Sequence, residues 1–128
     1  MNRKINKIPR IKYAGLFPLP DFQVFQLPNG TQVYYIQDEK INTCRVEWIF
    51  AAGRSYESVT SQSELTTAML RESNRQYSGY KNAEFFDQFG SSFYIYNGLD
   101  NVVAGYACLN TWTKKLFDRA LLSLREPA

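Results

Sequence analysis

The chain has 128 residues, of which 45% are hydrophobic and 16% aromatic, and it contains no histidine. A chain of this length forms one modest domain with a single core, and its composition excludes an intrinsically disordered protein. The formal net charge of +3 is too small to indicate a nucleic-acid-binding protein. Without histidine the chain lacks the commonest catalytic base, so its composition argues against nucleophilic catalysis by a serine or a cysteine.

The first twenty residues differ in character from the rest of the sequence. Residues 1–20 are basic, contain prolines and show no periodicity, so they are predicted to form an arm. No apolar stretch of the kind found in a secretion signal follows the basic residues, and no segment is apolar enough to span a membrane. We therefore expect a cytoplasmic protein.

The two cysteines, Cys44 and Cys108, lie far apart in strand-like surroundings. This usage is typical of a protein from a reducing compartment in which both side chains are buried thiols. A disulfide between them stays open at this point, although no feature of the sequence favours it.

Three strand-like segments open the folded part of the chain. Residues 22–27 and 31–37 flank Asn29-Gly30, a pair that favours the positive φ angles of a hairpin turn. Residues 44–52 alternate at first and then become wholly apolar, which is typical of a strand in the middle of a covered sheet. We therefore predict a β-hairpin followed by the central strand of the sheet.

Helical spacing begins after a polar loop at residues 54–61. The first helix carries Leu65, Ala68 and Met69 on one stripe, with Ser61 or Ser63 as its cap. A second helix is predicted between Ser78 as cap and Gly90 as the left-handed residue after its end. Its apolar stripe consists of Ala83, Phe85, Phe86 and Phe89.

The last elements are two strand-like runs, at residues 92–97 and 101–109, and an amphipathic helix that has Asn110 as its cap and ends before Pro127. The predicted order is therefore β-β-β-α-α-β-β-α. Such an order favours an α+β fold in which helices cover one face of a mainly antiparallel sheet.

Four segments occur in an order and spacing that resemble the start of a pitrilysin/insulinase-type zinc peptidase domain, the family that includes the mitochondrial processing peptidases. They are Leu27-Pro28-Asn29-Gly30, Ala52-Gly53-Arg54-Ser55-Tyr56-Glu57, Met69-Leu70 and Tyr77-Ser78 through Gly90. The resemblance runs from about Phe22 to the C-terminus. Because family domains are longer, it implies that residues 21–128 are the N-terminal portion of one such domain.

In active members of this family the first helix carries an inverted zinc motif, H-x-x-E-H. With Met69 just after the motif, the resemblance places Glu64 and Ala68 at the two histidine positions and Thr67 at the general base. Only Glu64 has a side chain that can bind a metal, and a catalytic zinc needs three protein ligands. The resemblance therefore implies a non-catalytic member without a metal cofactor, in which Glu64 is an ordinary first-turn carboxylate favourable to the helix dipole.

The strand after Gly90 is the candidate binding element. The resemblance implies that Phe93, Tyr94, Ile95, Tyr96 and Asn97 lie near a sheet edge where active members bind an extended substrate by strand addition. The alternative is an ordinary strand whose alternating side chains line two faces.

The expected function is that of an inactive subunit which supports or completes the substrate chamber of a zinc-bearing partner chain, or which associates with itself. The alternative is a stand-alone module that binds peptides or mediates assembly. Single-stranded nucleic-acid binding through the basic arm and the tyrosines is disfavoured, because the aromatic residues sit at core-like spacings.

Overall fold

The computed structural model describes residue 15 and residues 20–128, so the predicted arm of residues 1–20 lies almost entirely outside the described residues. The chain forms two compact units, residues 1–39 and residues 40–128. No helix in the described part of the chain is long and apolar enough to cross a membrane.

The first unit contains the predicted β-hairpin. Strand β1 (Gln23–Gln26) pairs antiparallel with β2 (Gln32–Tyr35). Its turn differs from the prediction, because Gly30 has a φ of +87° whereas Asn29 does not adopt a positive φ. The hairpin loop has three residues instead of two. A three-residue loop needs a left-handed residue only at its last position. The Asn29 side chain instead accepts a hydrogen bond from the backbone N–H of Thr31 at 3.1 Å.

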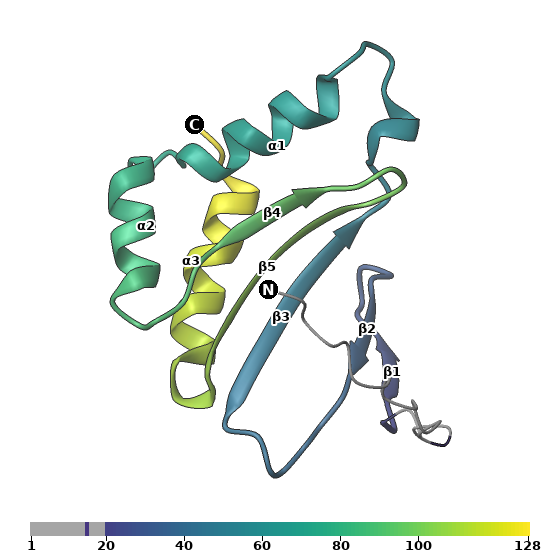
Figure 1. Cartoon of the computed structure of the whole chain (residues 1–128), viewed down its shortest axis with the longest axis vertical. Coiled ribbons are helices and arrows are strands. Elements are labelled where there is room, and N and C mark those ends of the chain that lie inside the picture. The colour runs from purple at the N-terminus through teal and green to yellow at the C-terminus, as the bar shows by residue number, and fades with distance from the viewer. Residues whose placement is uncertain (1–14, 16–19) are drawn as a thin grey trace, which may run out of the picture. The chain divides into compact units, whose positions relative to one another are not determined.

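The second unit is built on a three-stranded antiparallel sheet with helices on one face (Figure 1). Its strands are β3 (Thr43–Phe50), β4 (Tyr94–Asn97) and β5 (Val102–Leu109), in the order β3-β5-β4. The central strand of this sheet is β5, so the prediction that residues 44–52 form the central strand is wrong for it. The apolar end of β3 is not covered, since Ile49 is 66% exposed.

The helices follow the predicted order, with two short 3-10 helices added. They are η1 (Arg54–Tyr56), α1 (Gln62–Glu72), α2 (Gly79–Asp87), η2 (Asn110–Trp112) and α3 (Thr113–Arg125). Gly90 has a φ of +62°, as predicted for the residue after α2. Ser61 and Ser78 stand at the N-cap positions of α1 and α2, as predicted, but neither makes a side-chain capping bond. Asn110 starts η2 rather than capping α3, and its side chain donates to the carbonyl of Ile41.

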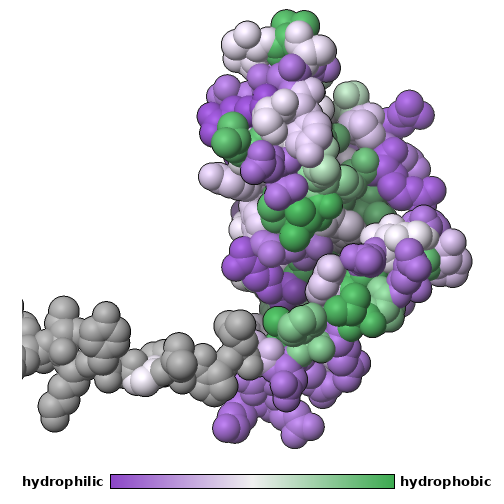
Figure 2. Space-filling model, turned by 90° about the vertical axis from the view of Figure 1, so that its right-hand side faces the viewer, coloured by the Kyte–Doolittle hydropathy of each residue, from purple (hydrophilic) through white to green (hydrophobic). Residues whose placement is uncertain are grey.

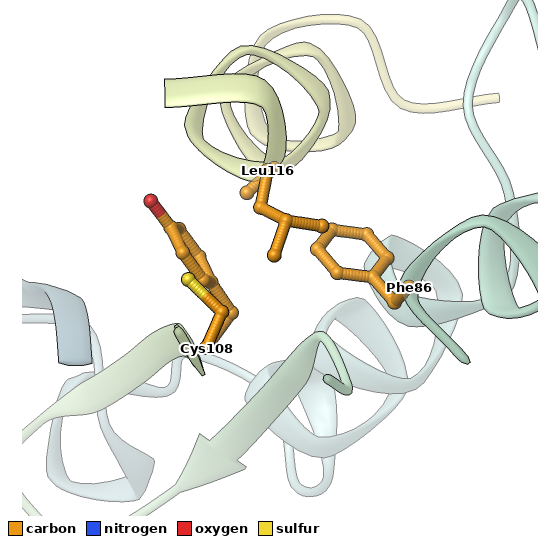
Figure 3. Close-up of a cluster of buried hydrophobic side chains, with 5 residues drawn as sticks. Phe86, Cys108 and Leu116 are labelled. Atoms are coloured by element: carbon orange, nitrogen blue, oxygen red, sulfur yellow. The ribbon is translucent and has the colours of Figure 1, made fainter. Parts of the chain in front are cut away.

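The core lies between the sheet and the helices. Figure 3 shows Phe86 of α2, Cys108 of β5 and Leu116 of α3 pointing toward one another. Tyr106 is fully buried beside them and donates its hydroxyl to the carbonyl of Thr113 at 2.9 Å. Burial raises the pKa of Tyr106 far above its usual value. Partly buried rings complete the cluster, namely Trp48, Phe85, Phe89, Phe93 and Phe117.

A small group of buried polar side chains joins the helices. The amides of Asn74 and Asn82 both donate to the hydroxyl of Ser123, at 3.0 and 3.2 Å. Asn74 follows α1, whereas Asn82 lies in α2 and Ser123 in α3.

The predicted α+β fold, with helices packed on one face of an antiparallel sheet, is confirmed. Apolar residues also reach the surface among polar ones, as the face in Figure 2 shows.

Candidate functional site

The three positions that the resemblance assigns to the zinc motif do not form a site on α1. Glu64 and Ala68 lie one turn apart and are both exposed. Thr67 is buried, with 8% of its surface exposed, and its hydroxyl donates to the carbonyl of Glu64 at 2.9 Å. The Thr67 side chain therefore packs into the fold, and its proton is already used in a hydrogen bond.

These residues also lack the chemistry that a catalytic metal requires. Zinc in a hydrolytic site is held by three nitrogen, sulfur or oxygen ligands from the protein, and a glutamate nearby activates the bound water. Here a single carboxylate stands beside a methyl group and a hydroxyl. Among residue 15 and residues 20–128, no group of three histidine, cysteine, aspartate or glutamate side chains is placed to hold a metal ion.

Glu57 fixes the start of α1. Its carboxylate accepts hydrogen bonds from the backbone N–H groups of Ser61 and Ser63, at 3.1 and 2.9 Å, and from the Ser63 hydroxyl. The bond from the Ser63 hydroxyl, helped by those from the backbone, holds the pKa of Glu57 below its usual value. Ser61 has a φ of +67°, and elsewhere in the described chain a positive φ occurs only at glycine. Glu57 thus stabilises a strained turn at the head of the helix.

Asn97 connects the same helix end to β4. The Ser63 hydroxyl gives its single proton to Glu57, so the Asn97 amide has to donate to the Ser63 oxygen. With the amide turned so that both of its groups are paired, its nitrogen lies 3.3 Å from that oxygen. Its carbonyl oxygen then accepts the backbone N–H of Glu64 at 3.2 Å. Sequence reasoning assigned Asn97 to the binding strand and missed this link, because the partner is distant in the chain.

Strand β4 lies at one edge of the three-stranded sheet, and within residues 20–128 only β5 pairs with it. Phe93 packs against the core, whereas Tyr96 is on the opposite face of the strand and is 66% exposed. The alternation of side chains matches the sequence pattern. The structure thus shows β4 at a sheet edge. The peptide-binding role of residues 93–97 stays a prediction.

A largely apolar cavity of about 430 Å³ lies between α1 and the sheet, next to β4. Its apolar lining includes Leu70, Ile95, Val102, Ala104 and Leu124, drawn from α1, the two strands and α3. The buried Thr67 also lines it, and so does Glu57, whose carboxylate binds the start of α1. A second cavity of about 350 Å³, beside α2, is lined by charged side chains such as Arg71 and Asp87 and touches neither Thr67 nor β4. The apolar cavity is therefore the better candidate site, since it lies next to an edge strand and is lined by the buried Thr67 of α1.

A polar cluster occupies the face of the sheet opposite the core. Tyr94 donates its hydroxyl to Glu47 at 2.8 Å, and the guanidinium of Arg45 lies 2.6 Å from the same carboxylate oxygen. The Tyr94 side chain crosses the central strand at Gly105, where a Cβ atom would come within 2.8 Å of its hydroxyl. Burial alone would raise the pKa of Glu47, but the hydrogen bonds from Tyr94 and Arg45 outweigh it and lower the value. The cluster ties β4 to β3 across β5, a role that the sequence did not indicate.

No protein-family model matches this chain, and no curated protein matches it either. Solved structures do match. The chain is similar to a peptidase M16 inactive domain from Pseudomonas fluorescens, with a TM-score of 0.78 and 22% identity, over 84% of this chain and 27% of that one. It is also similar to a protease from Helicobacter pylori, with a TM-score of 0.78 and 14% identity, over 87% of this chain and 27% of that one.

The chain spans about a quarter of the length of these two solved chains. At such low identity the likeness concerns the fold alone. The expected α+β architecture is supported, because the chain shares its fold with part of a peptidase M16 inactive domain. The chain therefore has the α+β fold found in part of an M16-type peptidase chain.

Proposed function

We propose that this chain is part of a catalytically inactive pitrilysin-like subunit, which supports or completes the substrate chamber of a zinc-bearing partner chain. The observation that carries the proposal is the state of α1. The resemblance assigns α1 to the motif helix, but Glu64 and Ala68 are exposed while Thr67 is buried and lines the apolar cavity. These side chains offer neither a set of metal ligands nor a base, and under this proposal the zinc-bearing partner chain carries out hydrolysis.

The start of α1 is nevertheless held firmly in place. Glu57 and Asn97 together bind the first backbone N–H groups of the helix and the Ser63 side chain. None of these contacts involves a metal ligand. The start of α1 is therefore held by side chains of this chain itself, as a supporting subunit requires.

The binding elements next to α1 do not depend on zinc either. An extended peptide can pair with the outer backbone groups of β4, because strand addition uses main-chain hydrogen bonds for its affinity. Every second side chain of an added strand would then face the helix side of the sheet, where the apolar cavity lies. We propose that this cavity accepts an apolar side chain of the substrate.

The test is purification of the native protein followed by identification of whatever accompanies it. We expect a stoichiometric partner that carries an intact H-x-x-E-H motif, and peptide cleavage by the pair but not by this chain alone. Metal analysis of the isolated chain by mass spectrometry should find no bound zinc. One equivalent of tightly held zinc on this chain would contradict the proposal.

A second candidate function is a stand-alone peptide-binding or assembly module. It is favoured by one observation, namely that β4 and the apolar cavity both lie within the single compact unit of residues 40–128. Under this hypothesis the protein purifies without a zinc-bearing partner. It should then bind an extended apolar peptide with an affinity that adding such a partner does not change.

A matched pair of variants tests the peptide site itself in either case. Ile95→Asp puts a charge into the apolar cavity, whereas Tyr96→Asp puts the same charge on the exposed face of the same strand. We expect the first change to weaken binding of a fluorescent apolar peptide at least about tenfold, since it buries an unpaired charge against the ligand. The second change should alter the affinity less than about threefold. Equal effects would place the peptide elsewhere.

A further inference from the structure

The two cysteines, which the sequence separates widely, meet in the sheet. In the pairing of β3 with β5, Cys44 lies directly opposite Cys108. Directly opposed residues of an antiparallel pair carry their side chains on the same face of the sheet. Both residues are free thiols in the structure.

The backbone geometry places this pair within reach of a disulfide bond. Hydrogen-bonded pairs recur at every second residue of an antiparallel ladder. The backbone N–H of Asn110 donates to the carbonyl of Asn42 at 3.0 Å, and the cysteines lie two residues along from them on each strand. Cys44 and Cys108 therefore form a hydrogen-bonded pair, in which the Cα atoms are about 5.5 Å apart. Disulfides span Cα separations of about 4.4–6.8 Å.

The two thiols differ in access to reagents. Cys44 is half-buried, in an edge strand of the sheet, whereas Cys108 is only 5% exposed and packs in the core. Burial also raises the pKa of the Cys108 thiol, which keeps it protonated and slow to react with reagents in solution. An oxidant will therefore meet Cys44 first.

We propose that Cys44 and Cys108 are a thiol-oxidation site that forms a reversible disulfide across the two strands, with a small-molecule disulfide such as oxidised glutathione as the oxidant. The Cys44 thiolate attacks one sulfur of the oxidant, which forms a mixed disulfide and releases one thiolate. The Cys108 sulfur, after loss of its proton, then attacks the Cys44 sulfur and releases the second thiolate. The protein loses two electrons and two protons, and the oxidant is reduced to two thiols.

The expected effect of the bond is to lock β3 to the central strand. The bond would close a loop that contains α1, α2 and β4, so it restrains most of the candidate site. Side chains at hydrogen-bonded positions stand farther apart than at the alternate positions. Closing the bond therefore requires a small shift of the strands, and bonds under such strain are easily reduced.

The test uses the whole native chain, oxidised glutathione, alkylation of the remaining thiols and peptide mapping by mass spectrometry. Because the second thiol is held next to the first, the cross-strand disulfide should exceed the glutathione adduct by more than about tenfold. Dithiothreitol should restore both thiols. A stable adduct on Cys44 with Cys108 still a thiol would overturn the proposal, and so would covalent dimers through Cys44.

Two variants separate the steps. In Cys108→Ser the reaction should stop at the adduct on Cys44, and in Cys44→Ser the buried Cys108 should stay unmodified for as long as the wild-type chain takes to oxidise. Cys108→Ala replaces Cys108→Ser if the serine disturbs folding. For the wild-type chain itself, a disulfide that forms only in urea and not under native conditions would equally overturn the proposal.

Discussion

The aromatic core and the start of α1 are held together by different forces. Around Tyr106, rings and aliphatic side chains exclude water, and Phe86 stacks on Phe93 with their centroids 5.6 Å apart. At the start of α1, a carboxylate and an amide bind the helix instead. The core depends on area buried, whereas the helix start depends on a few directed bonds. The difference teaches that the core and the start of α1 can fail separately, because the core cluster contains neither Glu57 nor Asn97.

The largest effect should come from breaking the core. Phe86→Ala removes a ring that is 1% exposed and contacts three other rings, so it should lower the free energy of unfolding by about 3–5 kcal/mol. Urea denaturation followed by tryptophan fluorescence measures this loss. Tyr80→Ala is the control in the same helix, since Tyr80 is 78% exposed and its truncation should change stability by less than about 0.5 kcal/mol. Similar losses in both variants would show that α2 is not anchored through Phe86.

A smaller effect should follow from cutting the link between β4 and α1. Asn97→Ala removes the amide that meets Ser63 and Glu64 and should cost about 1 kcal/mol of stability. Amide hydrogen exchange should show faster opening of the first turn of α1 while exchange in β5 stays slow. If exchange accelerates equally in both elements, the core and the start of α1 open as one cooperative unit and are not held separately.

Sequence reasoning predicted the elements well because they depend on local patterns. The order of strands and helices, the hairpin and the left-handed Gly90 follow from periodicity and turn chemistry. The strand order did not follow, since the apolar run at the end of β3 looks the same whether it lies in the middle or at the edge of a sheet. The strand order and the exposed Ile49 show that β3 lies at the edge of this sheet.

The site was predictable only in part. The absence of histidine from the motif positions is visible in the sequence, and so is the alternation of residues 93–97. Glu57 and Asn97 were not identified as partners of α1. The contacts of Asn97 join residues more than 30 positions apart, and those of Glu57 cross a loop without a periodic signal. The opposition of Cys44 and Cys108 likewise requires the register between β3 and β5, which local patterns do not set.

Lowering the pH should destabilise the start of α1 before it affects the core. The pKa of Glu57 is lower in the folded chain than in the unfolded one, so this carboxylate stabilises the fold fully above its unfolded pKa, around pH 4. The contribution is lost as the pH falls further, through the lower folded pKa. Glu57→Gln should remove this pH dependence and speed amide exchange in the first turn of α1 at neutral pH.

Glu64→Gln is the matched control for that change, because it removes a carboxylate from the same helix end without removing a bond to a backbone N–H group. It should leave exchange at the start of α1 nearly unchanged, apart from a small dipole effect. The comparison is decided by amide exchange at neutral pH and again below pH 4 in all three chains. If Glu57→Gln exchanged as slowly as Glu64→Gln, the helix start would be held by Asn97 and the strand contacts alone. The carboxylate at position 57 would then have no special role in keeping α1 in place.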